Sequence, residues 1–223
     1  REGFGEESIY VTGNTAVDAL LLTVRDGYIF KDPRLNEIDF ESSRNILVEV
    51  HRRENFGQGM EDIGAALREI AETRDDIQLL VSVHKNPRAG EPVKRRLAAA
   101  PRTVLFDPLD YPDYVNLMGR CYLVVTDSGG AQEEAPSLGV PVILCRDLTE
   151  RPEAVAGGTV ALVGTNKQLI VSTMTDLLDN SLRYASMSRV GNPFGDGRAS
   201  ERIVKAIRYS FGLAGNRPED FSI

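Results

Sequence analysis

Short runs of consecutive apolar residues recur along the chain, separated by longer stretches of mixed polarity. Six of these runs have the length of a β-strand and are rich in Val, Ile and Leu; they cover residues 46–50, 77–83, 103–106, 122–126, 142–144 and 160–163. Strands with continuous rather than alternating apolar residues are covered on both faces, which is typical of parallel sheets with crossover helices. The pattern therefore predicts an α/β fold with a Rossmann-like, doubly wound parallel sheet.

Helical periodicity fills the intervals between these runs and continues to the end of the chain. An apolar helix is expected at 16–24, where Gly13-Asn14-Thr15 provides a turn and a cap, and a polar connector follows at 31–45. Crossover helices are expected at 59–73, 92–100, 112–118 and 130–138, and three further helices at 167–178, 182–190 and 199–211.

The composition adds to this picture mainly by excluding partners. A chain of 223 residues with 42% hydrophobic content can bury one good core, and none of its apolar runs reaches the roughly 20 residues needed to span a bilayer. Because no signal-peptide pattern opens the chain either, we expect a cytoplasmic protein with no membrane partner. A net charge of −7 argues against binding to nucleic acid. Cys121 and Cys145 border predicted strands, where a free thiol usually acts as a small buried hydrophobe.

Polar residues suited to chemistry follow the predicted strands. In a parallel sheet the carboxyl ends of the strands meet at one edge, and ligands bind there near the point where the strand order reverses. Both histidines of the chain fall on this edge, which contains His51-Arg52-Arg53, His84-Lys85, Asp107-Pro108, Asp127-Ser128-Gly129-Gly130 and residues 146–153. We therefore expect the ligand site among these segments.

The turn Ser128-Gly129-Gly130 leads from a predicted strand into a helix. Its backbone N–H groups would point outward at the positive end of the helix dipole, where a phosphate binds well. The two glycines permit close approach of a ligand, and Ser128 can cap the helix or donate to an oxygen. Glu134 lies one helical turn further on, where its carboxylate could accept both hydroxyls of a ribose. The alternative is an ordinary tight turn followed by solvated helix surface.

The loop His51-Arg52-Arg53 offers two fixed cations and one titratable group. These suit a diphosphate or the protonation of a leaving oxygen. The alternative is a basic loop held by salt bridges to Glu54 or Glu49. His84 is either a second ligand contact or a bystander, and Tyr114 either stacks on a base or packs in the core.

No cofactor is indicated, and metal binding finds no support in the sequence. The two histidines lie 33 positions apart, and the carboxylates are scattered, so no recognisable ligand set is present.

Five longer segments together resemble one family. They are VTGNTAVDAL at 11–20, HRRENFG at 51–57, DSGGAQEEAPSLGVPV at 127–142, TERPEA at 149–154 and NPFGDGRAS at 192–200. In this order and spacing, from about Ile9 to Ile207, the chain resembles the non-hydrolysing UDP-N-acetylglucosamine 2-epimerases. The resemblance implies a two-domain fold of the glycosyltransferase B type, with UDP bound between the domains and mainly to the C-terminal one.

The resemblance also implies roles for individual residues. Ser128, Gly129 and Gly130 would contact the diphosphate, and Glu134 would accept the ribose diol. His51 would contact the diphosphate and assist its departure, which makes it the implied catalytic residue. The other implied substrate contacts are Arg52, His84, Arg151 and Tyr114.

The sequence departs from the family pattern at three places. Tyr114 stands where the family has a Phe packed on uracil, so the position keeps an aromatic face and gains a hydroxyl. Lys85 replaces an apolar residue after His84. Before His51, the segment Val48-Glu49-Val50 replaces the usual small residues, which changes the fine geometry expected there.

The family reaction eliminates UDP to give a 2-acetamidoglucal and adds it back with the opposite configuration at C2, converting UDP-N-acetylglucosamine to UDP-N-acetylmannosamine. The family's candidate acid and base carboxylates belong to an N-terminal domain, and this chain starts at the linker. We therefore expect a C-terminal half that holds UDP and is inactive alone. Residues 1–40 would be the linker and its helix, 41–195 the UDP-binding domain, and 196–223 a C-terminal helix and tail.

The resemblance further implies a homodimer in the full-length protein and a role in cell-surface polysaccharide biosynthesis. Three alternatives to the epimerase remain open from the sequence. The chain could be part of a glycosyltransferase of the same fold, a module that binds UDP-sugars without catalysis, or a hydrolysing epimerase that releases free N-acetylmannosamine.

Overall fold

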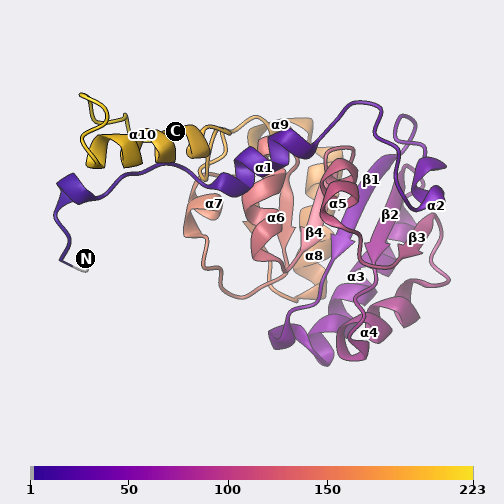
Figure 1. Ribbon diagram of the computed structural model, residues 1–223. Coiled ribbons are helices and arrows are strands. Elements are labelled where there is room, and N and C mark those ends of the chain that lie inside the picture. The colour runs from indigo at the N-terminus through magenta and orange to yellow at the C-terminus, as the bar shows by residue number, and fades with distance from the viewer. Residues whose placement is uncertain (1–2, 223) are drawn as a thin grey trace.

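The computed structural model describes residues 3–222 and contains one six-stranded, fully parallel sheet. The strand order is β3-β2-β1-β4-β5-β6 (Figure 1), which is the doubly wound order of Rossmann folds. The strands are β1 (Arg44–Glu49), β2 (Ile77–Ser82), β3 (Thr103–Phe106), β4 (Leu123–Thr126), β5 (Val142–Leu144) and β6 (Val160–Leu162). Each predicted apolar run forms one strand, and the predicted fold class is confirmed.

Helices cover both faces of the sheet and create two apolar cores. On one face, α3 (Gln58–Thr73), α4 (Pro87–Leu97), α8 (Lys167–Asp179) and α9 (Ser181–Ser188) contribute to the first core. On the other face, α5 (Tyr111–Met118) and α6 (Gly129–Glu134) contribute to the second core, and α1 (Thr15–Thr23) packs against both. Because both faces of the central strands are covered, β1, β2 and β4 can each carry consecutive apolar residues, as in 46–48, 79–81 and 123–125.

Two helix boundaries differ from the sequence prediction. The helix predicted at 92–100 is α4, which begins at Pro87 because the side chain of Asn86 accepts from the backbone N–H of Arg88. Pro87 therefore occupies the first turn, where its missing N–H costs nothing, and Pro92 lies inside the helix. The helix predicted at 130–138 is α6 up to Glu134, followed by the 3-10 helix η3 (Ala135–Leu138).

Four short helices were not predicted from the sequence. The polar connector at 31–45 contains α2 (Pro33–Asn36), which is capped by Asp32 and buries Leu35 completely in the second core. The others are η1 (Glu6–Ser8), η2 (Arg53–Asn55) and α7 (Pro152–Ala156).

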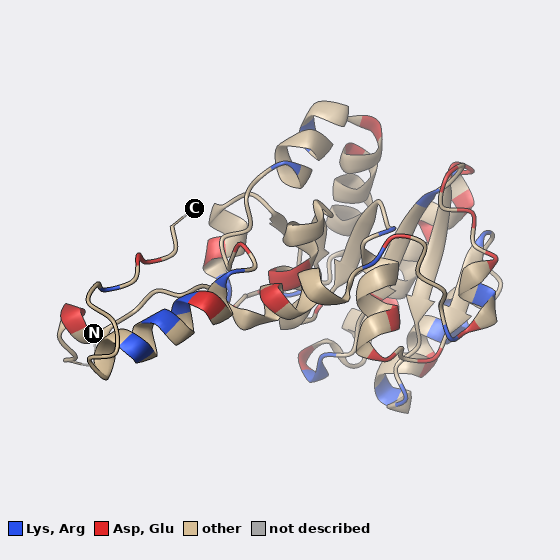
Figure 2. Ribbon diagram, turned by 45° about the horizontal axis from the view of Figure 1, so that its top comes forward, with Lys and Arg blue, Asp and Glu red and all other residues tan. Residues whose placement is uncertain are grey.

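The last helix, α10 (Ala199–Ser210), extends away from the body of the sheet beside the N-terminal segment (Figure 1). Only Ala199 and Ala206 of this helix are buried, and Figure 2 shows both basic and acidic residues along it. Its first turn is held by Asp18 of α1, whose carboxylate accepts from the backbone N–H groups of Ala199 (3.1 Å) and Ser200 (2.8 Å).

Both cysteines lie in the interior of the fold. Cys121 and Cys145 are free and buried, and burial raises the pKa of both thiols, so each behaves as the buried hydrophobe that the sequence predicted.

Within residues 3–222, no helix combines the length and the apolar character needed to cross a bilayer.

Candidate functional site

The strand order reverses between β1 and β4, and the loops that follow these two strands meet at the carboxyl edge of the sheet. The two loops contact each other directly, because the backbone N–H groups of His51 and Arg52 donate to the carboxylate of Asp127. The structure therefore brings together the two segments from which the sequence predicted the ligand site.

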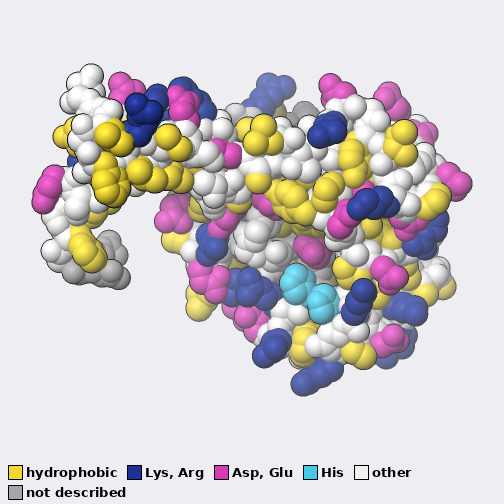
Figure 3. All heavy atoms as spheres, viewed as in Figure 1, with side chains coloured by type: hydrophobic (Ala, Val, Ile, Leu, Met, Phe, Trp, Pro, Cys, Tyr) yellow, Lys and Arg dark blue, Asp and Glu magenta, His cyan; other side chains and the backbone are white. Residues whose placement is uncertain are grey.

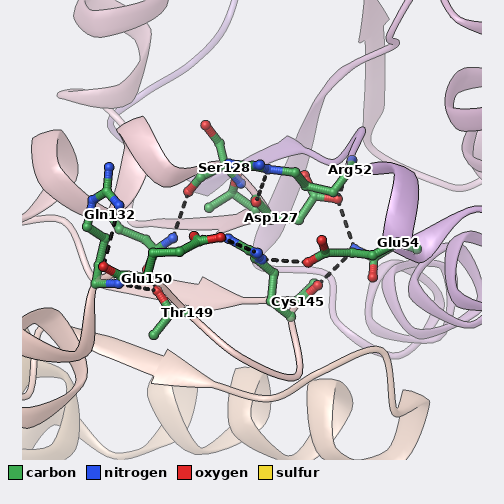
Figure 4. A network of polar contacts seen from close by, with 12 residues as sticks. Arg52, Glu54, Asp127, Ser128, Gln132, Cys145, Thr149 and Glu150 are labelled. Atoms are coloured by element: carbon green, nitrogen blue, oxygen red, sulfur yellow. Dashed lines mark hydrogen bonds and ion pairs between the residues drawn. The ribbon is translucent and has the colours of Figure 1, made fainter.

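Asp127 organises this edge from beneath. Its carboxylate is fully buried and accepts from His51 N (2.9 and 3.0 Å), Arg52 N (2.8 Å) and Asn55 Nδ2 (2.9 Å). Asn55 Nδ2 also donates to the carbonyl oxygen of Cys145 (2.9 Å), which connects the loop to the end of β5 (Figure 4). The sequence analysis treated Asp127 only as the start of a turn. An Asp at a strand end usually indicates a turn, and only the tertiary contacts show that it holds a second loop.

The two histidines lie against each other. Their rings are stacked with centroids 5.1 Å apart and an interplanar angle of 12°, and Figure 3 shows them side by side on the molecular surface near several basic side chains. His84 Nδ1 accepts from the backbone N–H of Asn86 (3.0 Å), which leaves Nε2 for other partners. His51 Nδ1 is buried 3.8 Å from Asp127 Oδ1 and has no hydrogen-bond partner among residues 3–222. The ring of His51 therefore offers Nε2 to a ligand.

Two guanidinium groups border the glycine turn at the start of α6. A methyl group placed on Gly129 would lie 3.4 Å from Arg52 Nη2 and 4.0 Å from Arg151 Nη2. A methyl group on Gly130 would lie 3.9 Å from both Glu134 Oε2 and Ser128 Oγ. The turn therefore has cations on one side and a carboxylate and a hydroxyl on the other.

Ser128 is the N-cap residue of α6, but its side chain makes no capping hydrogen bond. Its backbone is fixed at both ends, since Ser128 N donates to Thr126 Oγ1 (2.9 Å) and Ser128 O accepts from Gln132 Nε2 (3.1 Å). The sequence predicted that the Ser128 hydroxyl either caps the helix or donates to a ligand oxygen. Because it makes no capping bond, donation to a ligand oxygen is the use that remains.

The loop that carries Arg151 is attached to α6. Arg151 Nε pairs with Glu133, whose other oxygen accepts from Asn14 Nδ2 (2.6 Å). The backbone N–H of Arg151 donates to Thr149 Oγ1 (3.0 Å), and Thr149 Oγ1 in turn donates to Gln132 Oε1 (2.6 Å), as Figure 4 shows. The guanidinium is therefore held in place while its Nη2 end stays near Gly129.

The alternative role expected for the basic loop after β1 is to form salt bridges with Glu54 or Glu49. The structure does not show these salt bridges among the residues that it describes. Glu54 pairs with the buried Arg146 (2.6 Å), which also pairs with Glu150 (2.7 Å), and Glu49 accepts from a tyrosine. Arg52 instead donates from Nε to the carbonyl oxygen of Asp127 (3.2 Å). The Nη2 atom of Arg52 remains directed at the glycine turn.

Glu134 is 8% exposed and lies in a tyrosine-lined part of the edge. Tyr111 donates its hydroxyl to Glu134 Oε1 (3.0 Å). Burial raises the pKa of the Glu134 carboxyl, the neighbouring Glu133 and Glu49 raise it further, and the hydrogen bond from Tyr111 acts in the opposite direction. Tyr114 packs against the second core, and its hydroxyl donates to Glu49 Oε2 (2.8 Å).

The sequence profile of the family described as UDP-N-acetylglucosamine 2-epimerase matches residues 1–208. The UDP-N-acetylglucosamine 2-epimerase of Escherichia coli (strain K12) is 49% identical over 214 residues, which are 93% of this chain and 57% of that protein. The chain belongs to this family.

Solved structures agree in both fold and sequence. Staphylococcus aureus MnaA in complex with UDP has a TM-score of 0.91 and 42% identity, covering 99% of this chain and 60% of that one. The UDP-GlcNAc 2-epimerase of Neisseria meningitidis bound to UDP-GlcNAc has a TM-score of 0.85 and 38% identity, covering 93% of this chain and 57% of that one. The chain thus spans less than two thirds of the length of these relatives and corresponds to the C-terminal part of their glycosyltransferase B-like fold.

Proposed function

We propose that this chain is the UDP-binding part of a UDP-N-acetylglucosamine 2-epimerase, which interconverts UDP-N-acetylglucosamine and UDP-N-acetylmannosamine. The observation that carries the proposal is the glycine turn at the switch point of the sheet, where the guanidinium groups of Arg52 and Arg151 lie next to Gly129. Two cations beside glycine backbone suit a diphosphate, and glycine leaves room for its oxygens. The UDP and UDP-GlcNAc complexes of the S. aureus and N. meningitidis relatives support the same ligand class.

His51 is placed to assist the departure of the diphosphate. Asp127 accepts from its backbone N–H, and its Nδ1 is buried facing Asp127 without a hydrogen bond, so Nε2 is the ring nitrogen that can meet a diphosphate oxygen. Donation of a proton from Nε2 would neutralise charge that develops on UDP as its bond to C1 of the sugar breaks. His84, stacked on His51, would contact the substrate from the same side.

Glu134 and Tyr114 would bind the nucleoside. The carboxylate of Glu134 faces the glycine turn one helical turn from Gly130 and can accept both hydroxyls of a ribose. The ring of Tyr114 would stack on the uracil. The diphosphate would then lie over Ser128, Gly129 and Gly130, between Arg52 and Arg151.

The rest of the chemistry would come from a second domain. A base is needed for the C2 proton of the sugar, and the resemblance places the family's candidate carboxylates in an N-terminal domain. Residues 1–40 would serve as the linker, 41–195 as the UDP-binding domain and 196–223 as the helix and tail. The reaction would need neither metal nor cofactor, and the complete enzyme would act in the cytoplasm as a homodimer that supplies polysaccharide synthesis.

Isothermal titration of the chain with UDP tests the binding site. Arg52→Met should weaken UDP binding by roughly tenfold or more, because it removes a charged donor beside the diphosphate. Arg53→Met is the matched control, since Arg53 is exposed on the same loop and should cause a much smaller loss. Equal losses in both variants, or no binding of UDP by the unaltered chain, would contradict the proposal.

NMR of UDP-N-acetylglucosamine with the chain tests the need for a second domain. We expect no change at the anomeric and C2 protons with the chain alone, and turnover when the N-terminal part of a relative is fused ahead of it. Turnover by the isolated chain would refute the division of labour. UDP binding without turnover in the fusion would instead indicate a binding module, and free N-acetylmannosamine would indicate a hydrolysing enzyme.

A further inference from the structure

Two tyrosines of α5 reach two carboxylates at the carboxyl edge of the sheet. Tyr111 donates to Glu134 Oε1 (3.0 Å), and Tyr114 donates to Glu49 Oε2 (2.8 Å). Residues 111 and 114 are three positions apart and so lie on the same face of the helix. The helix is therefore attached to the proposed nucleoside site by two hydrogen bonds.

Glu49 is unusual for the last residue of a central strand. In β1 the side chain of Leu47 enters the second core, and because side chains alternate along a strand, that of Glu49 points to the same face. A carboxylate there is partly buried and needs a donor to offset its lost hydration. The hydroxyl of Tyr114 supplies that donor, whereas a Phe at this position could not.

The pair joins two places where the sequence departs from the family pattern. By the resemblance, Tyr114 stands where the family has a Phe, and Glu49 lies in the Val48-Glu49-Val50 segment where the family has small residues. Their side chains meet at hydrogen-bond distance although they are 65 positions apart in sequence. Each replacement gives the other its partner, so the two form one unit.

We propose that Glu49 is a positioning residue for Tyr114, holding the phenol ring so that it sets how tightly the nucleoside end of a nucleoside diphosphate binds. The inference rests on the proposed UDP site and adds a residue to it. Without the hydrogen bond, the ring of Tyr114 regains torsional freedom that ligand binding must then remove. The Glu134 pair beside it would hold the ribose, so base and ribose would both rest on groups attached to α5.

The role of the pair is separable from diphosphate binding. The diphosphate end would lie at Gly129, beside Arg52 and Arg151, and among the described residues no hydrogen bond or ion pair joins either guanidinium to Glu49 or Tyr114. Loss of the pair should therefore weaken UDP without weakening inorganic pyrophosphate. General loosening of the fold would weaken both.

Isothermal titration with UDP and with inorganic pyrophosphate tests the inference on the whole chain. Tyr114→Phe and Glu49→Ala should each weaken UDP binding about five- to tenfold, as loss of one buried hydrogen bond allows, and should not weaken pyrophosphate binding. The double variant should be no weaker than the weaker single variant, because both changes remove the same interaction. Glu49→Gln keeps an acceptor for the hydroxyl and should restore UDP binding to within about twofold.

Tyr122→Phe is the matched control, since it removes a tyrosine hydroxyl that bonds to the carbonyl oxygen of Leu177 away from the site. It should change neither affinity. The inference is overturned if Tyr114→Phe and Glu49→Ala bind UDP like the unaltered chain, if they weaken pyrophosphate equally, or if Glu49→Gln is as weak as Glu49→Ala. In each case the proposed function stands as long as the unaltered chain binds UDP; absence of that binding would overturn both.

Discussion

Asp127 shows how one buried side chain can position the residues of a proposed site. It is fully buried, and its carboxylate is the common acceptor for the backbone of His51 and Arg52 and for the side chain of Asn55. A buried carboxylate is tolerated where donors replace its hydration, and the donors here are the loop itself. The residues proposed to touch the diphosphate therefore owe their positions to one that lies beneath them.

Asp127→Asn should lower the free energy of unfolding by about 3 kcal/mol, because the new amide places a donor against groups that are themselves donors. Urea unfolding followed by circular dichroism measures this change. Asp75→Asn is the control, since Asp75 is exposed, and it should change the free energy of unfolding by less than about 0.5 kcal/mol. Equal stability of the two variants would contradict the organising role of Asp127.

The raised pKa of the Glu134 carboxyl predicts that the free energy of unfolding depends on pH. Its pKa is raised above the usual 4.5 by burial and by Glu133 and Glu49, so the folded chain binds this proton more tightly than the unfolded chain does. The contribution of Glu134 to stability is therefore lost as pH rises from about 4.5 through the raised pKa. Glu134→Gln lacks this titration. Its free energy of unfolding, relative to that of the unaltered chain, should rise over that interval and level off above it in urea unfolding at successive pH values. A constant difference would contradict the raised pKa.

At the scale of secondary structure, short helices in connectors contribute more than their polar sequences indicate. The helix α2 has four residues, yet it places Leu35 at 0% exposure in the second core with Phe30 and Phe106. Asp32 caps it and Pro33 begins it, so the local signals for a helix are present. A single apolar side chain among polar residues gives no helical periodicity, so the sequence predicts only a polar connector there.

Leu35→Ala should cost about 2–5 kcal/mol of unfolding free energy, because it leaves a cavity in a packed core. Leu22→Ala is the matched control, since Leu22 is 80% exposed and its truncation should be nearly neutral. Both are measured by urea unfolding. A neutral Leu35→Ala would show that the connector is not part of the core.

At the scale of the whole molecule, the two ends of the described chain are joined outside the sheet. Val11 N donates to Asp220 Oδ1 (2.9 Å), Val11 O accepts from Phe221 N (2.6 Å), and the guanidinium of Arg217 lies over the ring of Tyr10 (4.6 Å). The segment at 11–20 resembles the part of the family that leads from one domain into the next. The tail thus holds the start of the proposed linker beside α10.

Asp220→Ala should raise the hydrogen-exchange rate of the Val11 amide about fivefold, because that amide loses its acceptor. Asp220→Asn keeps an acceptor oxygen and should retain most of the protection. Amide exchange followed by NMR measures both. Equal exchange in the two variants would contradict the contact.

The sequence by itself determined the sheet and the edge at which the ligand site is proposed. Continuous apolar runs such as 77–83 can be satisfied only with helices on both faces, and parallel strands bring the segments after them to one edge regardless of packing detail. For the same reason the residues around His51 and Gly129 could be assigned to one site before any contact was known. Family motifs then supplied the ligand class, which the matching relatives support.

Only the tertiary structure decided which polar groups form hydrogen bonds with one another. The roles of Asp127 as an acceptor beneath the basic loop and of Glu49 as the partner of Tyr114 depend on pairs separated by 65 to 76 positions. Such pairs leave no periodic signal, because a hydrogen bond depends on where two elements come to lie and not on the spacing within either one. The local pattern specifies what each segment can form, and the packing of segments specifies what each polar group meets.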